Sequence, residues 1–128
     1  MKKVIIIFQS VFLFTLFISC KKNGAGGDAE LNITVKHHEK LIPGASVYIK
    51  YGAKEFPGFD LNVYDEKKYA GNSGEEAGKT KIDNLLKGDY YLFALGYDSA
   101  IFENVSGGIY VKVSKSSEIK NIEIPITE

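Results

Sequence analysis

The sequence predicts an all-β fold: a single antiparallel β-sandwich of about seven strands. Short segments in which apolar and polar residues alternate recur between clusters of turn residues along most of the chain. The chain has eight tyrosines and eight phenylalanines but no tryptophan, and residues 90–97 are apolar on both faces, as in a buried central strand. Residues 30–128 are therefore expected to form one domain, which follows a predicted signal peptide.

The first two strands are predicted from alternation. Leu31, Ile33 and Val35 alternate with polar residues, and the Pro-Gly pair at 43–44 signals a turn. Alternation resumes over residues 45–51. We expect these two strands to form either a hairpin or a pair across the sandwich.

The segment 52–68 keeps neither the strand period nor the helix period, and a Pro-Gly pair at 57–58 interrupts it. We predict a long connection with a short helical turn near 60–64, followed by a short edge strand at 68–71. Long connections in compact domains are often functional, so this one is the first place to look for a site.

The second half of the chain alternates in the same way and ends in a strand at 121–126 that contains Pro125. Proline cannot donate to a ladder, so we expect this last strand at a sheet edge. A Ser-Gly-Gly segment at 106–108 suggests a turn between two short strands. The predicted strands are 79–83, the central strand 90–97, a hairpin of 99–104 with 109–113, and 121–126.

Three segments carry a resemblance to a known fold family. Ile42-Pro43-Gly44-Ala45-Ser46-Val47-Tyr48-Ile49, Gly78-Lys79-Thr80-Lys81-Ile82-Asp83-Asn84-Leu85 and Lys87-Gly88-Asp89-Tyr90-Tyr91-Leu92 follow one another in the chain. Together they resemble the carboxypeptidase regulatory-like, or transthyretin-like, β-sandwich. The resemblance implies an Ig-like, prealbumin-like Greek key. It says little about function, because such sandwiches serve as spacers, adhesins and receptor accessories.

The first twenty residues have the layout of a secretory signal. Lys2 and Lys3 precede an apolar run at 4–18, and the small residue Ser19 precedes Cys20, the only cysteine in the chain. The run is shorter than the roughly 20 residues that span a bilayer as a helix. The alternatives are an ordinary secretory signal that leaves a free thiol, or a membrane helix that is never cut.

Leu16-Phe17-Ile18-Ser19-Cys20 resembles the lipobox of bacterial lipoproteins. The resemblance implies a signal peptide at 1–19, cleavage before Cys20, a diacylglycerol on its sulfur and a third acyl chain, such as palmitate, on its amino group. More than one acyl chain is needed for stable anchoring, and three would anchor the protein firmly. The Gly-rich, polar segment at 20–29 is then expected to be the lipidated cysteine with a flexible tether.

Lys21 and Lys22 follow Cys20 where lipoproteins kept in the inner membrane carry aspartate. By resemblance, this predicts a location in the cell envelope, lipid-anchored in the outer membrane on its surface or its periplasmic face. The membrane is thus the first expected partner, through acylated Cys20.

Charge and composition exclude several classes of function. Lysines and acidic residues number 16 each, and removing residues 1–19 leaves two more acidic residues than lysines. Such a balance argues against nucleic acid as a partner. Arginine is absent, so the bidentate guanidinium contacts that favour phosphate or carboxylate ligands are also absent.

No metal site or cofactor is predicted. His37 and His38 are adjacent, and adjacent strand residues point to opposite faces, so one ion would rarely meet both imidazoles. Four acidic residues in the long connection match no calcium-loop spacing. These are Glu55, Asp60, Asp65 and Glu66.

No catalytic residue is predicted, and we expect the protein not to be an enzyme. The transthyretin-like fold includes a hydrolase branch, whose active site by resemblance uses an arginine as well as histidines. This chain has no arginine, and its two histidines lie together beside a turn. A hydrolase that uses the 52–68 connection is the less favoured alternative.

Aromatic residues are the candidate ligand-binding set. Phe56, Phe59 and Tyr64 lie in the long connection, and Tyr91 and Phe93 point to one face of the central strand. Exposed together, they would make an apolar stacking surface for sugar rings or for a protein. The alternative is that they complete the core under the connection.

Asp98-Ser99-Ala100 resembles the acceptor of a bacterial O-glycosylation system, which implies a glycan on an exposed Ser99. The combined expectation is an outer-membrane lipoprotein that acts as a non-catalytic binding or structural module. It would be an accessory to glycan or nutrient uptake or to adhesion, with a glycan or an envelope protein as its partner. A purely structural envelope spacer is the alternative.

Overall fold

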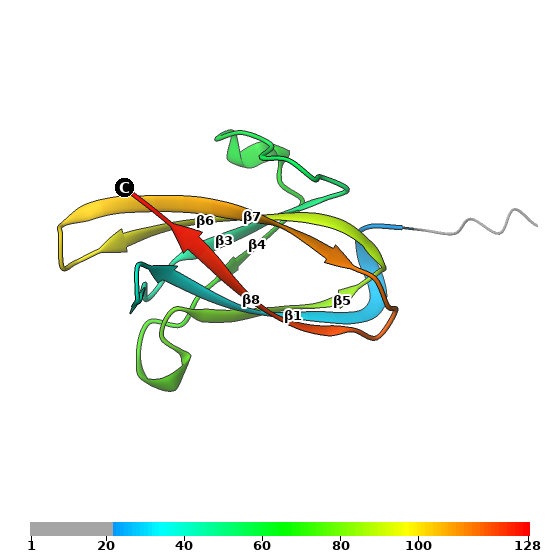
Figure 1. Cartoon of the computed structure of the whole chain (residues 1–128), viewed down its shortest axis with the longest axis horizontal. Helices are drawn as coiled ribbons and strands as arrows, with labels where there is room; N and C mark the ends of the chain where they lie inside the picture. Colours follow the sequence, from blue (N-terminus) through cyan, green and yellow to red (C-terminus); the bar gives the residue numbers. More distant parts are fainter. Residues whose placement is uncertain (1–21) are drawn as a thin grey trace, which may run out of the picture.

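The computed structural model describes residues 22–128, which form an all-β fold of two four-stranded sheets (Figure 1). One sheet contains β1 (Ala25–His37), β2 (Lys40–Leu41), β5 (Lys79–Leu85) and β8 (Ile119–Ile126). The other has the order β4 (Glu66–Tyr69), β3 (Ser46–Tyr51), β6 (Gly88–Asp98) and β7 (Glu103–Val113). The predicted all-β class with two sheets is confirmed.

Two details of the predicted class need correction. The described residues form eight strands instead of about seven, because Lys40–Leu41 adds a short strand to the end of β1. The sheets are also not wholly antiparallel, since β8 runs parallel to β1 from Glu30 with Ile119 to His37 with Ile126. All other strand pairs are antiparallel.

The core lies between the two sheets because alternation turns one side of each strand inward. Leu31, Ile33 and Val35 of β1 are almost fully buried, as are Tyr90 and Leu92 of β6 in the facing sheet. One contiguous cluster of buried residues joins both sheets. Its other large members include Ile42, Val47, Ile49, Ile82, Leu85 and Ile124.

Several predicted elements are confirmed. The segment 90–97 is central, because β6 pairs with β3 on one side and β7 on the other. The strand at 121–126 is an edge strand that pairs only with β1 in its sheet, and a single bridge links Ser106 to Thr127 beyond it. A 3-10 helix, η1 (Leu61–Val63), lies where a helical turn was expected. The strands at 31–35 and 45–51 face each other across the core and do not form a hairpin.

The predicted hairpin of 99–104 with 109–113 is wrong. Residues 103–113 form one strand, and the chain turns at 99–102. Gly107 does not form a turn but lets β7 approach β8 closely. A Cβ there would lie 2.2 Å from the carbonyl oxygen of Pro125 in β8. Sequence alone cannot distinguish these two uses of glycine.

The tether predicted at 20–29 also differs from the structure, because the fold begins at Asn23. The backbone amide of Asn23 donates to the carbonyl of Lys87, and the Tyr90 hydroxyl accepts from the Gly24 amide at 2.9 Å. Ala29 is fully buried in β1. Gly27 permits a close approach, since a Cβ there would lie 2.1 Å from the carbonyl oxygen of Leu85. The glycine-rich composition therefore serves packing over residues 23–29.

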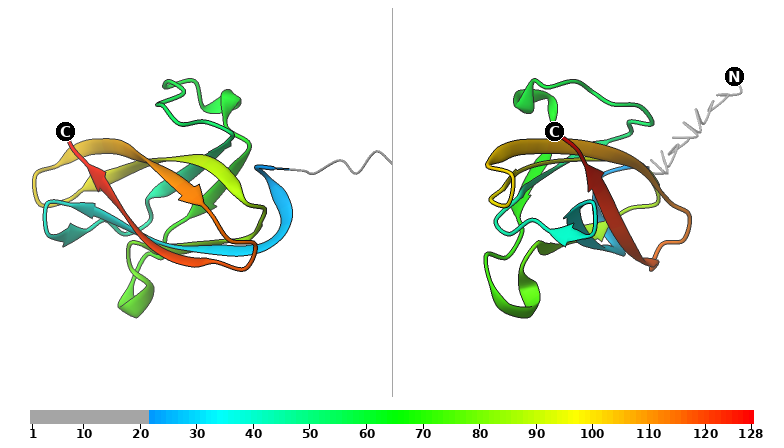
Figure 2. Two further views of the ribbon diagram at one scale, coloured as in Figure 1. Left: turned by 45° about the vertical axis from the view of Figure 1, so that its right-hand side comes forward. Right: turned by 60° about the vertical axis from the view of Figure 1, so that its left-hand side comes forward.

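The two ends of the sandwich carry different features. The described chain begins at one end, whereas its last residue and the 99–102 turn lie at the other (Figure 1). Figure 2 shows the loop before β4 on one side of the sandwich and the loop before β5 on the opposite side. Among residues 22–128, no helix has the length and apolar character needed to cross a membrane.

Candidate functional site

The five aromatic residues predicted as a ligand-binding set lie together on the outer face of the β4-β3-β6-β7 sheet. Tyr90 and Leu92 of β6 point into the core, so Tyr91 and Phe93 point outward. The loop at 52–65 folds over this face and brings three more rings to it.

Phe93 is the centre of this aromatic cluster. Its ring centroid lies 5.2 Å from Phe56 and 5.9 Å from Phe59, and it stacks at 18° on Tyr64 at 5.8 Å. Phe56 also meets Phe59 edge to face at 4.9 Å and lies 6.0 Å from Tyr91. These separations are in the range of favourable ring pairs.

Tyr48 is a sixth member that the sequence argument did not single out. It lies 5.6 Å from Tyr64 and 6.5 Å from Phe93, and it is largely buried. Its signal was available, because Tyr48 alternates with the core residues Val47 and Ile49 and so faces outward.

The cluster is buried at its base and open at its top. Phe93 is 2% exposed, whereas Phe56 is 41% and Phe59 is 73% exposed. Phe93 is therefore packed as in a core, whereas Phe56 and Phe59 leave apolar surface open to a ligand. Phe59 projects to solvent on a base of packed rings.

Hydrogen bonds hold the loop in place over this face. The Tyr51 amide donates to a carboxylate oxygen of Asp65 at 2.7 Å, and the Tyr64 hydroxyl donates to the carbonyl of Gly58 at 2.9 Å. Burial raises the pKa of Tyr64 to about 12, so the phenol remains a donor well above the pH at which an exposed tyrosine ionises. Asp60 accepts from the Asn62 amide and caps η1.

The four acidic residues weighed for calcium all lie in or beside this loop, and three have local partners. Asp60 and Asp65 make the bonds just described, and Glu66 accepts from the Tyr51 hydroxyl at 3.0 Å. The carboxylates of Asp60, Asp65 and Glu66 therefore hold the loop in place.

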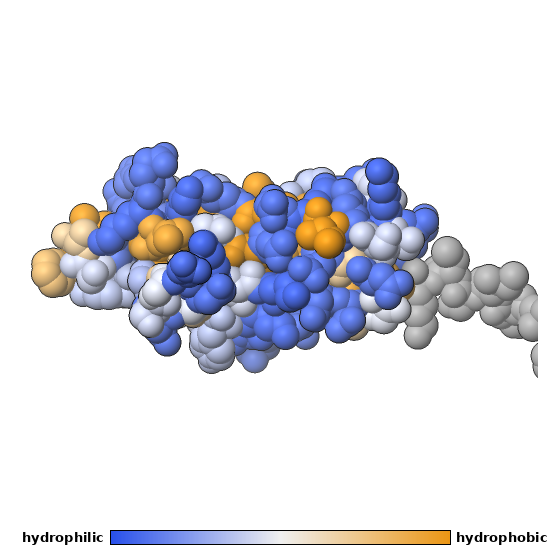
Figure 3. All heavy atoms as spheres, turned by 90° about the horizontal axis from the view of Figure 1, so that it is seen from below, coloured by the Kyte–Doolittle hydropathy of each residue, from blue (hydrophilic) through white to orange (hydrophobic). Residues whose placement is uncertain are grey.

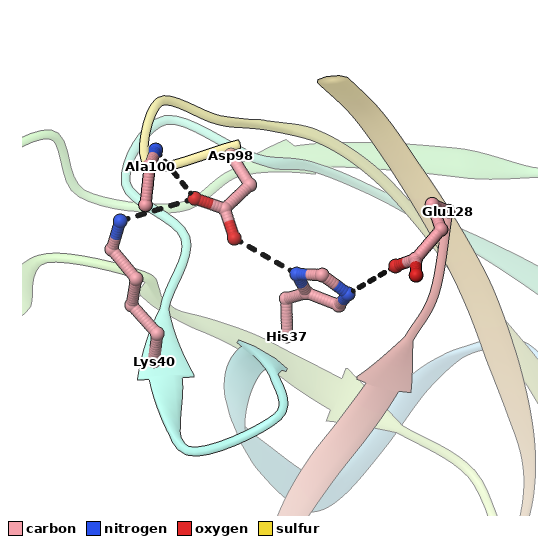
Figure 4. Close-up of polar contacts among 5 residues, drawn as sticks. All are labelled: His37, Lys40, Asp98, Ala100 and Glu128. Atoms are coloured by element: carbon pink, nitrogen blue, oxygen red, sulfur yellow. Dashed lines mark hydrogen bonds and ion pairs between the residues drawn. The ribbon is translucent and has the colours of Figure 1, made fainter. Parts of the chain in front are cut away.

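A buried polar cluster, which the sequence argument did not assemble, lies at the end of the sandwich where β1 and β6 finish (Figure 4). His37 Nδ1 lies 2.8 Å from Asp98 Oδ2, and His37 Nε2 lies 2.7 Å from Glu128 Oε2. Lys40 Nζ and the Ala100 amide donate to Asp98 Oδ1 at 3.0 and 2.8 Å. Only tertiary structure shows this cluster, since His37 and Asp98 are 61 positions apart.

Electrostatics in the cluster follow from these contacts. Hydrogen bonds from His37, from the Ala100 amide and from Lys40 hold the pKa of Asp98 far below its usual range. The bond to Asp98 raises the pKa of His37, against the opposing effect of burial. His37 Nε2 faces a carboxylate here and not a hydroxyl or thiol, so the geometry is not that of a histidine activating a nucleophile.

Ser99 is exposed in the turn after β6. Its neighbour Asp98 has a structural role, because it is buried and accepts from the Ala100 amide two residues on. The Asp-Ser-Ala sequence thus forms a turn that leaves the Ser99 hydroxyl accessible.

The opposite face of the molecule, over β1, β5 and β8, is mainly hydrophilic with isolated hydrophobic residues (Figure 3). An open groove of about 840 Å³ lies on this sheet beside the loop before β5. Asn32, Thr34, Asn121 and Glu123 contribute polar side chains to it, and the exposed ring of Tyr69 lies at its margin. This polar groove lacks the group of exposed rings that distinguishes the aromatic cluster.

In comparisons with known proteins, no protein-family model matches this chain and no curated protein matches it significantly.

Proposed function

We propose that this protein is an outer-membrane-anchored lipoprotein whose sandwich acts as a non-catalytic binding module. The aromatic cluster is its ligand surface, and a glycan is the favoured ligand. In this proposal the sandwich is an Ig-like, prealbumin-like Greek key, and the protein is an accessory to glycan or nutrient uptake or to adhesion.

The single observation that carries the binding role is the exposed ring of Phe59 on a rigid base. The Phe59 ring is 73% exposed, so a ligand that covers it removes a large apolar area from water, which is favourable. Phe56 and Phe93 fix its position at 4.9 and 5.9 Å. Preorganised rings stack on a sugar face at low entropic cost.

The short distance between Cys20 and the sandwich supports a lipid anchor at this end of the domain. Only Lys21 and Lys22 separate Cys20 from Asn23, the first residue hydrogen-bonded to the sandwich. Three residue steps span at most roughly 11 Å. A lipid on Cys20, which lies outside the described residues, would hold this end of the sandwich close to the bilayer and leave the other end distant from it.

The test is retention of the purified protein on an array of oligosaccharides. We expect Phe59→Ala to abolish retention of the bound glycan and to leave the unfolding temperature almost unchanged. Phe102→Ala is the matched control, because Phe102 is a phenylalanine at 79% exposure in the turn after β6 and outside the aromatic cluster. The control is expected to bind as the wild type does.

Equal binding by Phe59→Ala and the wild type would remove the aromatic cluster from recognition. If the wild type binds no glycan on the array, the glycan assignment is wrong. The structural spacer then becomes the better account, since the nearly complete burial of Phe93 and Tyr48 shows that part of the cluster serves packing.

Glycosylation at Ser99 is a separate part of the proposal. It is supported by the exposure of this hydroxyl in a turn held by Asp98. The glycan would then lie at the end of the sandwich remote from the anchor.

A further inference from the structure

Three metal-ligating side chains converge at the end of the sandwich. A ring nitrogen of His37, a ring nitrogen of His38 and a carboxylate oxygen of Glu128 all lie within 4.8 Å of one another. No other set of three or more such residues is brought together within residues 22–128. His37 is the last residue of β1, His38 follows it in the turn to β2, and Glu128 lies two residues beyond the end of β8.

One backbone angle brings the two histidines together, contrary to the prediction that one ion would rarely meet both imidazoles. Adjacent strand residues do point to opposite faces, but His38 leaves the strand with φ at 53°. The two imidazole centroids are only 4.4 Å apart as a result. Both rings therefore lie on one side of the β1–β2 turn.

Asp98 gives His37 the surroundings of a metal ligand. Its carboxylate accepts from Nδ1 at 2.8 Å, which fixes the ring and directs the Nε2 lone pair toward Glu128 when a cation occupies the gap (Figure 4). Asp98 is itself held by Lys40 and the Ala100 amide and is 3% exposed. Metal-ligating histidines are typically oriented by a buried carboxylate in this way.

The geometry needs a small adjustment to admit an ion. His37 Nε2 and Glu128 Oε2 are 2.7 Å apart, whereas two ligands at about 2.05 Å in a tetrahedral site are separated by about 3.3 Å. Glu128 can supply this movement because its side chain is 56% exposed. The fixed His37 and the adaptable Glu128 and His38 leave one position of a tetrahedron open to water.

We propose that His37 Nε2, a ring nitrogen of His38 and the Glu128 carboxylate bind a divalent transition-metal ion, with Zn²⁺ as the best fit. Two imidazoles and one carboxylate match the nitrogen and oxygen donors that Zn²⁺ accepts, and the set lacks the oxygen-rich shell that Ca²⁺ or Mg²⁺ requires. The ion bridges the β1–β2 turn and the end of β8. This inference does not depend on the aromatic cluster or on the lipid anchor.

The experiment is calorimetric titration of ZnCl₂ into the intact protein, purified in mild detergent without a polyhistidine tag. We expect one Zn²⁺ per chain and a higher unfolding temperature in its presence. His38→Asn removes one ligand at an exposed position and suits the positive φ, so it should fold normally. We expect it to weaken binding by more than about tenfold, the lower limit for losing an outer-shell partner.

Glu39→Gln is the matched control, because Glu39 is the next exposed residue in the same turn and is not one of the three ligands. It should bind Zn²⁺ as the wild type does. Co²⁺ in place of Zn²⁺ should give the intense visible absorption of a tetrahedral site in the wild type and in Glu39→Gln.

Two results would overturn the proposal. Absence of stoichiometric Zn²⁺ binding by the wild type would leave His37, Asp98, Lys40 and Glu128 as a structural ion network. Binding that His38→Asn leaves unchanged would place the ion on other residues.

Discussion

Phe93 is buried on a face of its strand that points away from the core. Four other rings and the 52–65 loop account for this burial, since Phe56, Phe59 and Tyr64 lie within 6 Å of its centroid and Tyr48 lies at 6.5 Å. One residue thus supports the exposed ring of Phe59 and the loop that carries it. Phe93 therefore contributes mainly to stability, whereas the exposed Phe59 is the ring proposed to bind a ligand.

Phe93→Ala should destabilise the protein by about 3 kcal/mol or more, because it removes a fully packed ring and leaves a cavity. Phe59→Ala should cost only about 1 kcal/mol, because its ring is mostly in water and loses only its edge-to-face pairs with Phe56 and Phe93. Urea unfolding measures both. Similar costs for the two substitutions would show that the cluster has no open side.

The sequence predicted this cluster through parity and position. Tyr91 and Phe93 alternate with core residues and so share the outer face of their strand. A long loop with three aromatic residues was expected to pack on a surface or form a site. The same pattern could not predict the polar cluster of His37, Asp98 and Glu128. His37, Asp98 and Glu128 are distant in the chain, and the turn at His38 depends on one backbone angle that periodicity does not report.

At the scale of elements, the 52–65 loop is an ordered structure with its own hydrogen bonds. Asp65 binds the Tyr51 amide at its end, Asp60 caps η1, and Tyr64 bonds to Gly58 across the loop. Long insertions of this kind form small clusters of their own outside the main core. The sequence indicated the loop and its helical turn, but not which carboxylates would fasten it.

The Tyr64 phenol provides a pH test of this packing. Burial raises its pKa to about 12, above the value near 10 for an exposed tyrosine. Because the folded state favours the neutral phenol, the stabilisation is complete below about pH 10 and is lost as the pH rises from 10 to 12.

The measurement is ultraviolet titration of tyrosinate in the wild type and in Tyr64→Phe, with circular dichroism to confirm that both remain folded. The difference between the two curves should have its midpoint near pH 12. The urea-unfolded proteins are the reference, with a difference near pH 10. A midpoint near 10 in the folded protein would mean that the loop is open in solution.

Two glycines caused the errors in the predicted strand boundaries. Gly27 and Gly107 allow one backbone to approach another closely, whereas their composition suggested a linker and a turn. In both cases, the partner strand that imposes the requirement is distant in sequence. Apolar alternation predicted the elements, and close packing between them decided where they begin and end.

In the molecule as a whole, the sandwich has two ends, and the proposed lipid anchor lies next to one of them. Asn23 starts the fold at one end, and Glu128 and the 99–102 turn lie at the other. The aromatic cluster lies on one side between them. This arrangement supports the proposed function, in which one end is held at a membrane and the aromatic cluster binds a ligand from the side.

Mass spectrometry of the N-terminal peptide is the first test of the proposed lipid anchor on Cys20. The protein would be expressed in a Gram-negative host and purified from the membrane fraction, beside Cys20→Ser as the control. We predict a chain that begins at Cys20 and carries three acyl chains, and a Cys20→Ser chain that carries none. A wild-type chain that still begins at Met1, or a Cys20 with a free thiol, would rule out the lipid anchor.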